Sequence, residues 1–243
     1  MQKFWEKTKE TFTIGVGTAM EITGTKKFEE TPEFLAKVQF LDTFEMNCKN
    51  LQRSLNSFSA SINNLGESES ETASVFAKSF EGDGGQFEQM SLNFRGVADA
   101  TKQTLQEMTN TSMSQNTIQP ILQTLEEISR LKKIMSKRKK NQILLDSAQS
   151  KYNSACEKGK TAQLPELQQA VELRKSKFDQ HNGAFISGVD ALINSRNEFF
   201  TRIFNSHQYF VKEMITQMKN NYESQMQNFE VDPSMQFPSI SSI

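Results

Sequence analysis

Glycine, proline and cysteine are scarce in this chain, and each scarcity excludes a class of protein. Eleven glycines and five prolines in 243 residues are too few for the closely spaced turns of a sheet-rich fold. The two cysteines, Cys48 and Cys156, offer no disulfide framework and fit a reducing compartment. No apolar run reaches the length of a signal peptide core or of a membrane span. We therefore expect a helical protein, soluble and made in the cytoplasm, for which any contact with a membrane would be peripheral, from the surface.

Histidine is equally scarce, and no catalytic or metal-binding constellation is visible. His181 and His207 lie 26 residues apart, without acidic or cysteine neighbours at metal-ligand spacing. Gly15-Val-Gly17 resembles half of a nucleotide-binding loop, but no Gly-Lys-Ser/Thr follows it and no strand precedes it. We expect neither an enzyme nor a protein that holds a metal or another cofactor.

Apolar residues at helical spacing, in contrast, are abundant and fall into three long segments. These are residues 32–80, 87–157 and 165–229, separated by two short stretches rich in glycine or lysine. Within each segment apolar residues recur in steps of three and four, as in a coiled coil. The steps of the second segment assign the following residues to its seam: Leu105, Met108, Ile118, Leu122 and Leu125.

The lengths of these segments predict an elongated architecture. At 1.5 Å per residue the second and third helices are each roughly 100 Å long. The short connections force the three helices to run antiparallel, and Pro120 should bend the second one. We expect a bundle of three kinked helices over residues 31–230. An N-terminal segment and link (1–30) precede it, and a disordered tail (231–243) follows.

The third helix carries more apolar residues than an intrachain core requires. Of the 34 residues from Phe185 to Met218, 16 are apolar, and they form two stripes rather than one. A second stripe favours burial against another chain, with a wider intrachain core as the alternative. The stripe predicts a homodimer interface with these members: Ile193, Phe200, Phe204, Val211 and Ile215.

The strongest asymmetry in the sequence is its charge. Residues 130–160 contain ten basic and two acidic residues, a net charge of +8, while the whole chain carries −1. At 100° per residue most of these basic residues share one face of the helix. Arg174 and Lys175 should lie opposite the end of this stripe once the third helix folds back. The stripe and hairpin suit anionic phospholipids such as phosphatidylserine and phosphoinositides.

Two other interpretations of the basic stretch remain open. It could be a solvated helix face, or Lys137-Arg-Lys-Lys140 could act as a nuclear import signal. The acidic remainder of the chain disfavours nucleic acid as a partner. Near the N-terminus, Phe4, Trp5 and Phe12 share one helical side, which could enter a lipid interface or pack on the bundle.

Several short stretches resemble the BAR domain family. Ile118-Gln-Pro120-Ile-Leu122 is similar to the apolar-x-Pro-Leu segment of the family's second helix. Lys137-Arg-Lys-Lys140, ending six residues before Asp146, resembles the family's basic run in the same helix. Leu51-Gln-Arg-Ser-Leu55, together with the stretch from Phe4 to Gly17, resembles the amphiphysin- and endophilin-like N-BAR members. Asn141 and the pair Leu144-Leu145 depart from the family pattern and dilute its charge.

The resemblance implies a crescent-shaped homodimer that binds anionic membranes, senses or generates curvature and acts in endocytosis or membrane trafficking. It assigns membrane contact to the concave face and the tips, through Arg130, Lys133, Lys137, Arg138, Lys140, Lys151, Lys158 and Lys160. The alternative is a dimeric scaffold of the same fold that binds small GTPases or cytoskeletal and endocytic proteins with little affinity for lipid.

Overall fold

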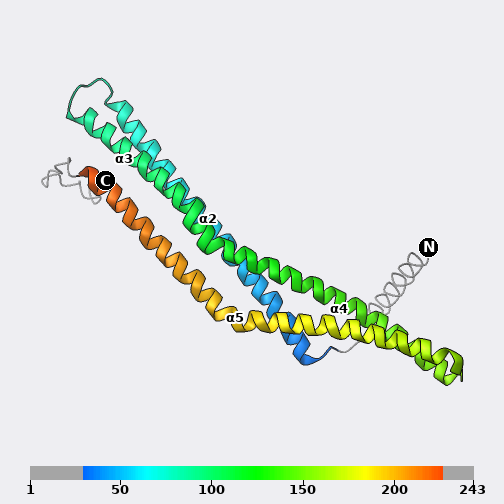
Figure 1. Ribbon diagram of the computed structural model, residues 1–243. Helices are drawn as coiled ribbons and strands as arrows, with labels where there is room; N and C mark the ends of the chain where they lie inside the picture. Colours follow the sequence, from blue (N-terminus) through cyan, green and yellow to red (C-terminus); the bar gives the residue numbers. More distant parts are fainter. Residues whose placement is uncertain (1–29, 227–243) are drawn as a thin grey trace, which may run out of the picture. The chain divides into compact units, whose positions relative to one another are not determined.

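The computed structural model describes residues 30–226, and every regular element in that range is a helix. The elements, shown in Figure 1, are α2 (Pro32–Ser79), α3 (Gln86–Met108), the π-helix η1 (Thr109–Ile118), α4 (Gln119–Glu157), the 3-10 helix η2 (Thr161–Gln163) and α5 (Leu164–Met226). Because α3, η1 and α4 continue one another, residues 30–226 form three long helices. The predicted all-α fold is confirmed.

Some of the predicted segments lie outside the described residues. These are the N-terminal segment up to residue 29, with Phe4, Trp5 and Phe12, the end of the third helix beyond residue 226, and the tail from 231 to 243. What the sequence predicts for these segments remains a prediction.

The start of α2 follows from its first residues. The side chain of Thr31 accepts a hydrogen bond from the backbone N–H of Phe34 at 3.3 Å. Thr31 thus satisfies one of the four N–H groups that lack partners at a helix start. Pro32 occupies the first helical position, where its missing N–H costs nothing.

The chain forms two compact units, each built from three helical segments. Unit 1 contains residues 30–49 and 123–197 of the described chain, and unit 2 contains residues 50–122 and 198–226. In unit 2, Asn63 bonds Thr109 while Ser70 bonds Asp99, so α2 runs antiparallel to α3 and η1. Unit 1 repeats this arrangement, since Asp42 pairs with Lys132 and Glu30 pairs with Arg138.

Each unit has its own aromatic and aliphatic core. In unit 1 the rings of Phe34 and Phe185 lie 5.1 Å apart, and Leu131 is also buried. In unit 2 the ring of Phe58 meets that of Phe210 edge-on at 6.3 Å. Burial of such large rings supplies most of the stability of a bundle.

The π-helix corrects the predicted seam of the second helix. Thr101, Leu105, Thr109, Met113 and Thr117 are all buried, at a constant spacing of four residues. The i→i+5 hydrogen bonds of a π-helix put more residues into each turn than the 3.6 of an α-helix. Residues four apart therefore stay almost in line from Thr109 to Thr117.

The remaining seam residues lie at the edge of this core. Met108, Ile118, Leu122 and Leu125 are only half-buried. Pro120 is the second residue of α4, just after the π-helix, and its missing N–H and its ring both oppose a regular α-helical ladder in the preceding turn. The wider π turn relieves that conflict.

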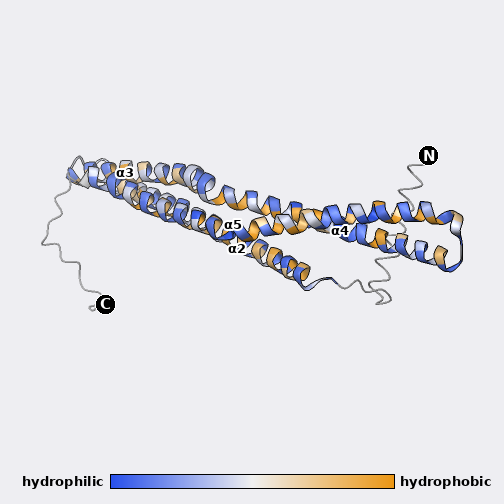
Figure 2. Ribbon diagram, turned by 60° about the horizontal axis from the view of Figure 1, so that its bottom comes forward, coloured by the Kyte–Doolittle hydropathy of each residue, from blue (hydrophilic) through white to orange (hydrophobic). Residues whose placement is uncertain are grey.

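Hydrophobic and hydrophilic residues alternate along every helix, as the colours of Figure 2 show. Among residues 30–226, no helix combines the length and the hydropathy that crossing a bilayer requires. The helices are amphipathic elements of a bundle.

Candidate functional site

The basic stretch of the sequence lies in unit 1, along α4 and the turn that leads to α5. Part of its charge is neutralised within the chain. Arg130 donates to Glu127 at 2.8 Å, which lowers the pKa of that carboxyl and raises that of the guanidinium. Lys132 contacts Asp42 at 2.7 Å and also pairs with Glu45. These hydrogen bonds raise the pKa of Lys132.

Arg138 departs from its predicted role in membrane contact. Its side chain is only 6% exposed, and it donates two hydrogen bonds to the Glu30 carboxylate, at 2.6 and 2.7 Å. A third bond, at 2.7 Å, goes to Asn182. The guanidinium lies 3.7 Å from the ring centroid of Phe34 and 4.9 Å from that of Phe178. A planar guanidinium suits this combination of stacking and paired bonding. Arg138 is therefore a buried core residue, and we remove it from the candidate membrane-binding residues.

Seven lysines of the predicted site are exposed, and six of them form no ion pair with any residue among 30–226. We call Lys133, Lys137 and Lys140 the mid-helix lysines, and Lys151, Lys158 and Lys160 the hairpin lysines. An exposed ammonium group without a counter-charge in its own chain can interact with an anionic partner at the lowest desolvation cost.

The two groups of lysines are separated on α4. At 100° per residue Leu144 falls on the same side of the helix as Lys137 and Lys151. Leu144 is 6% exposed and its neighbour Ile143 is 7% exposed. The stripe expected to be continuous is therefore divided into two basic groups by a buried turn.

Two further residues predicted near the hairpin differ from these lysines. Arg174 is half-buried and has an interaction partner. Lys175 is exposed but pairs with Asp179, four residues later, at 2.7 Å. Arg174 and Lys175 are therefore less available to an external anion than the hairpin lysines.

Three of the five predicted dimer residues of α5 are exposed in their own chain. Phe204 is 61% exposed, Ile215 is 58% exposed and Ile193 is 41% exposed. Phe200 and Val211 are half-buried. The prediction did not include two large apolar residues of α2, Leu65 and Phe76. Both are 50% exposed.

We also looked among the described residues for metal-ligand clusters and reactive thiols. No group of three or more His, Cys, Asp or Glu side chains within residues 30–226 has the geometry of a metal site. Both cysteines are free thiols, and burial raises the pKa of Cys48 to about 11.

Comparison with known proteins places this geometry in context. The family model described as "BAR domain" matches residues 1–230. No curated protein matches the chain. Among solved structures, the N-terminal I-BAR domain of IBARa from D. discoideum is 12% identical, with a TM-score of 0.45 over 86% of this chain and 94% of that one. The Imp2 F-BAR domain is 11% identical, with a TM-score of 0.35 over 77% of each chain.

Proposed function

Because the chain belongs to the BAR domain family, whose domains sense or generate membrane curvature, we propose that it is a crescent-shaped homodimer that binds anionic membranes through the exposed lysines of unit 1. In the cell it acts peripherally on the cytoplasmic face of membranes, in endocytosis or membrane trafficking. The N-BAR subgroup remains part of this proposal.

The availability of the mid-helix lysines is the observation that carries the proposal. Lys133, Lys137 and Lys140 share one side of α4, are exposed, and have no ion-pair partner among residues 30–226. Each lysine close to an anionic lipid surface contributes about 1 kcal/mol. Three of them on each of two protomers are sufficient for stable, salt-sensitive association.

The test is co-sedimentation of the chain with liposomes that contain or lack phosphatidylserine and phosphoinositide. Replacing Lys133, Lys137 and Lys140 by glutamate should abolish pelleting at low salt. The matched control replaces Lys78, Arg202 and Lys212 of unit 2, which are also exposed. It changes the net charge equally and should still pellet. If both variants pellet like the parent, the mid-helix lysines are not the membrane site. If the parent itself stays in the supernatant at low salt on every anionic mixture, the membrane function is wrong and the protein-scaffold alternative takes its place.

Electron microscopy of the pellets separates generation of curvature from sensing. Tubules in the pelleted liposomes would establish generation. Pelleting that prefers small vesicles without deforming large ones would establish sensing.

The dimer proposal is supported by the exposed apolar side chains of α5. Replacing Phe204 by glutamate should convert the dimer to a monomer in analytical ultracentrifugation, because a charge in an apolar interface loses its hydration. Tyr209 is the control, since it is 65% exposed but lies about 140° around the same helix. Replacement of Tyr209 by glutamate should leave the dimer intact. A Phe204→Glu chain that stays dimeric would disprove this interface.

A further inference from the structure

A serine lies in the middle of the mid-helix lysines. Ser136 belongs to α4, in unit 1, and its side chain is exposed. At 100° per residue it lies about 160° around the helix from the buried Arg138, so its hydroxyl faces away from the core. That hydroxyl makes no hydrogen bond with any residue among 30–226, whereas those of Thr72 and Thr104 donate to the carbonyl four residues before them. The Ser136 hydroxyl is therefore free to react.

The neighbours of Ser136 on the helix surface are all lysines. Residues three and four positions apart on a helix lie beside each other. For Ser136 these residues are Lys132, Lys133, Lys139 and Lys140. No other serine or threonine among residues 30–226 has a basic residue at all four of these positions. The surroundings of Ser136 are therefore distinct from those of every other hydroxyl in that range.

Two of these four lysines are available to a negative charge on Ser136. Lys132 is already paired with carboxylates of α2, and Lys139 has an interaction partner. Lys133 and Lys140 are exposed and form no ion pair with any residue among 30–226. An anion on the serine oxygen would thus compete with an anionic lipid for two of the three mid-helix lysines.

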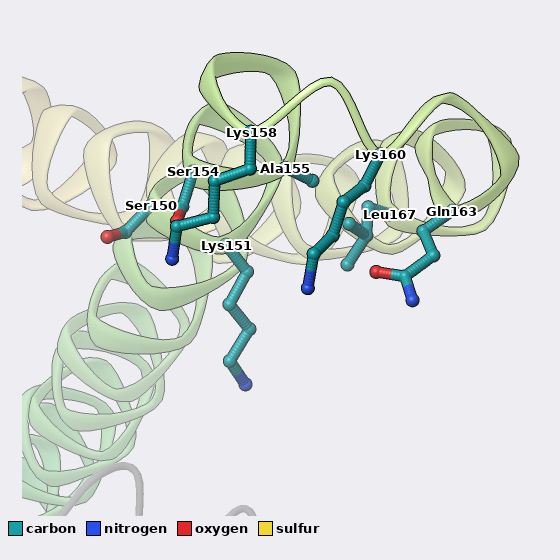
Figure 3. A pocket seen from close by; sticks show the side chains of 8 residues that line it. All are labelled: Ser150, Lys151, Ser154, Ala155, Lys158, Lys160, Gln163 and Leu167. Carbon is teal, nitrogen blue, oxygen red and sulfur yellow. The ribbon is translucent and has the colours of Figure 1, made fainter.

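The hairpin lysines have no serine in equivalent surroundings. Figure 3 shows Ser154 on the hairpin together with Lys151 and Lys158, which lie three residues before it and four residues after it. Ser154 is half-buried, however, and the acidic Glu157 lies three residues after it. A negative charge at Ser154 would meet a carboxylate as well as two ammonium groups.

The sequence around Ser136 suits a kinase that selects basic substrates. Six of the eight residues within four positions of it are lysine or arginine, and none is acidic. Carboxylates in a substrate cleft select such a run by complementary charge. A kinase binds its substrate as an extended segment, so α4 must open locally. Lys137 lies four residues after Lys133 and three before Lys140, and repulsion between like charges at these spacings weakens the helix there.

We propose that Ser136 is a phosphorylation site for a basophilic serine/threonine kinase, and that its phosphate pairs with Lys133 and Lys140 and so releases the mid-helix lysines from lipid. The Ser136 oxygen forms a bond to the γ-phosphorus of ATP while the bond from that phosphorus to the bridging oxygen breaks. ADP leaves, and the hydroxyl proton passes to the catalytic base of the kinase. The inference rests on the proposed function, to which it adds a means of regulation.

The expected size of the effect follows from the charges. A phosphoserine carries a charge of about −2 and three strong acceptor oxygens at neutral pH. The mid-helix lysines therefore fall from +3 to about +1 on each protomer. Each lysine near an anionic surface strengthens binding roughly fivefold, so the loss of two should weaken it about thirtyfold.

The first measurement tests the modification itself. The full-length chain is incubated with ATP and protein kinase C, and the phosphate is mapped by mass spectrometry. The comparison residue is Ser195, an exposed serine of unit 1 with no basic residue three or four positions away. Ser136 should be phosphorylated at least about tenfold faster than Ser195. Equal rates, or a Ser136 that stays unmodified, would overturn the proposal.

The second measurement tests the effect on membrane binding. Full-length chains with phosphoserine in place of either Ser136 or Ser195 have the same total charge, and both are titrated with phosphatidylserine vesicles. Phosphate at Ser136 should weaken binding about thirtyfold, and phosphate at Ser195 by less than about threefold. Equal weakening in the two chains, or no weakening in either, would refute the switch and leave the membrane function standing. A parent chain that binds no vesicle would refute the proposed function instead.

The third measurement needs no membrane and detects the ion pairs of the phosphate. In a pH titration followed by phosphorus NMR, the second pKa of the phosphate at Ser136 should lie below that of the phosphate at Ser195. Neighbouring ammonium groups favour the dianion, which is the cause of this difference. Replacing the exposed Lys133 and Lys140 by alanine should remove it. Equal pKa values for the two phosphates in the chain with its lysines intact would disprove the pairing.

Discussion

The described residues of unit 1 contain 16 basic and 12 acidic side chains, whereas those of unit 2 contain 7 basic and 11 acidic ones. The net charges are therefore +4 and −4, and the near-neutral total of the chain conceals them. Attraction to anions falls off within a Debye length of about 8 Å at physiological salt. The local sign, and not the chain total, therefore determines which part of the protein meets an anionic partner.

The interiors of the two units differ in the kind of polar group that they bury. Unit 1 buries a charge, Arg138, and neutralises it with Glu30. Unit 2 buries hydroxyl groups along α3 and η1 instead. Thr109 donates to Asn63 at 2.9 Å, and Thr101 accepts from Asn221 at 3.2 Å. Both units thus fix which helices pair, one by an ion pair and the other by neutral hydrogen bonds.

The largest expected effect concerns the buried charge of unit 1. Replacing Arg138 by methionine should lower the free energy of unfolding by about 3 kcal/mol, because the partly buried Glu30 carboxylate loses its partner. Urea denaturation followed by circular dichroism measures the loss. The exposed Lys133, replaced by methionine, is the control and should change stability by less than about 0.5 kcal/mol. Equal stability of the two variants would contradict the role given to Arg138.

Close helix contacts in each unit should produce the next largest effect. A Cβ added at Gly188 would lie 2.3 Å from Leu131, and one added at Gly66 would lie 3.0 Å from the Lys102 backbone. Alanine at either position should destabilise the protein by about 2 kcal/mol, since the crowding outweighs the gain in helix propensity.

Two other helical glycines provide matched controls for this prediction. A Cβ at Gly183 in unit 1 or at Gly96 in unit 2 would meet nothing within 4 Å. Alanine there should stabilise the chain by about 0.5–1 kcal/mol. If alanine at Gly188 or Gly66 were also stabilising in thermal melts, the close approach of the helices would be disproved.

A smaller effect separates two threonines of unit 2. The hydroxyl of Thr117 is buried and has no hydrogen-bond partner among residues 30–226, whereas that of Thr109 is bonded to Asn63. Replacing Thr117 by valine should stabilise the protein by about 1 kcal/mol, and the same change at Thr109 should destabilise it by about as much. Shifts of the same sign at both positions in urea denaturation would contradict this distinction.

The smallest effect is a dependence on pH in the α2–α3 turn. The Glu88 carboxylate accepts hydrogen bonds from the N–H groups of Gly82 and Gly84, at 3.0 and 2.8 Å, which lowers its pKa. Because the folded pKa lies below the ordinary value of 4.5, the stabilisation is present above pH 4.5 and is lost as pH falls through the lowered pKa. Glu88→Gln should flatten the acid limb of a stability profile. A Glu88→Gln variant whose acid limb matches that of the parent would contradict the role given to these two hydrogen bonds.

The sequence predicted most of the fold and part of the site, for reasons visible in particular residues. Steps of three and four define a helix wherever apolar residues mark the buried side. They failed between Thr101 and Thr117, because three of the buried residues there are threonines. In the π-helix itself the buried residues are Thr109, Met113 and Thr117, of which only Met113 is apolar, so the pattern of apolar residues carried little signal there.

At the candidate site, too, the residue types alone did not show which side chain is buried, as Arg138 illustrates. In Lys137-Arg-Lys-Lys140 every residue carries the same charge, so composition does not single out the buried one. The spacing of the helix does single out Arg138, because it lies seven residues after the buried Leu131 and four residues after Ile134. The partners Glu30, Phe34 and Phe178 come from distant segments, and only the folded chain brings them together.

The buried turn at Ile143 and Leu144 has a consequence for the kinetics of membrane attachment. It leaves two lysine groups, one within α4 and one at the hairpin, with a continuous helix from the first group to Lys151 of the second. Under the proposed function, once one group is attached, the other meets the lipid at a high effective concentration, so it rebinds faster than the protein diffuses away. Each contact can then exchange rapidly while the residence time of the whole protein stays long. Loss of either group should shorten that residence time far more than it slows arrival.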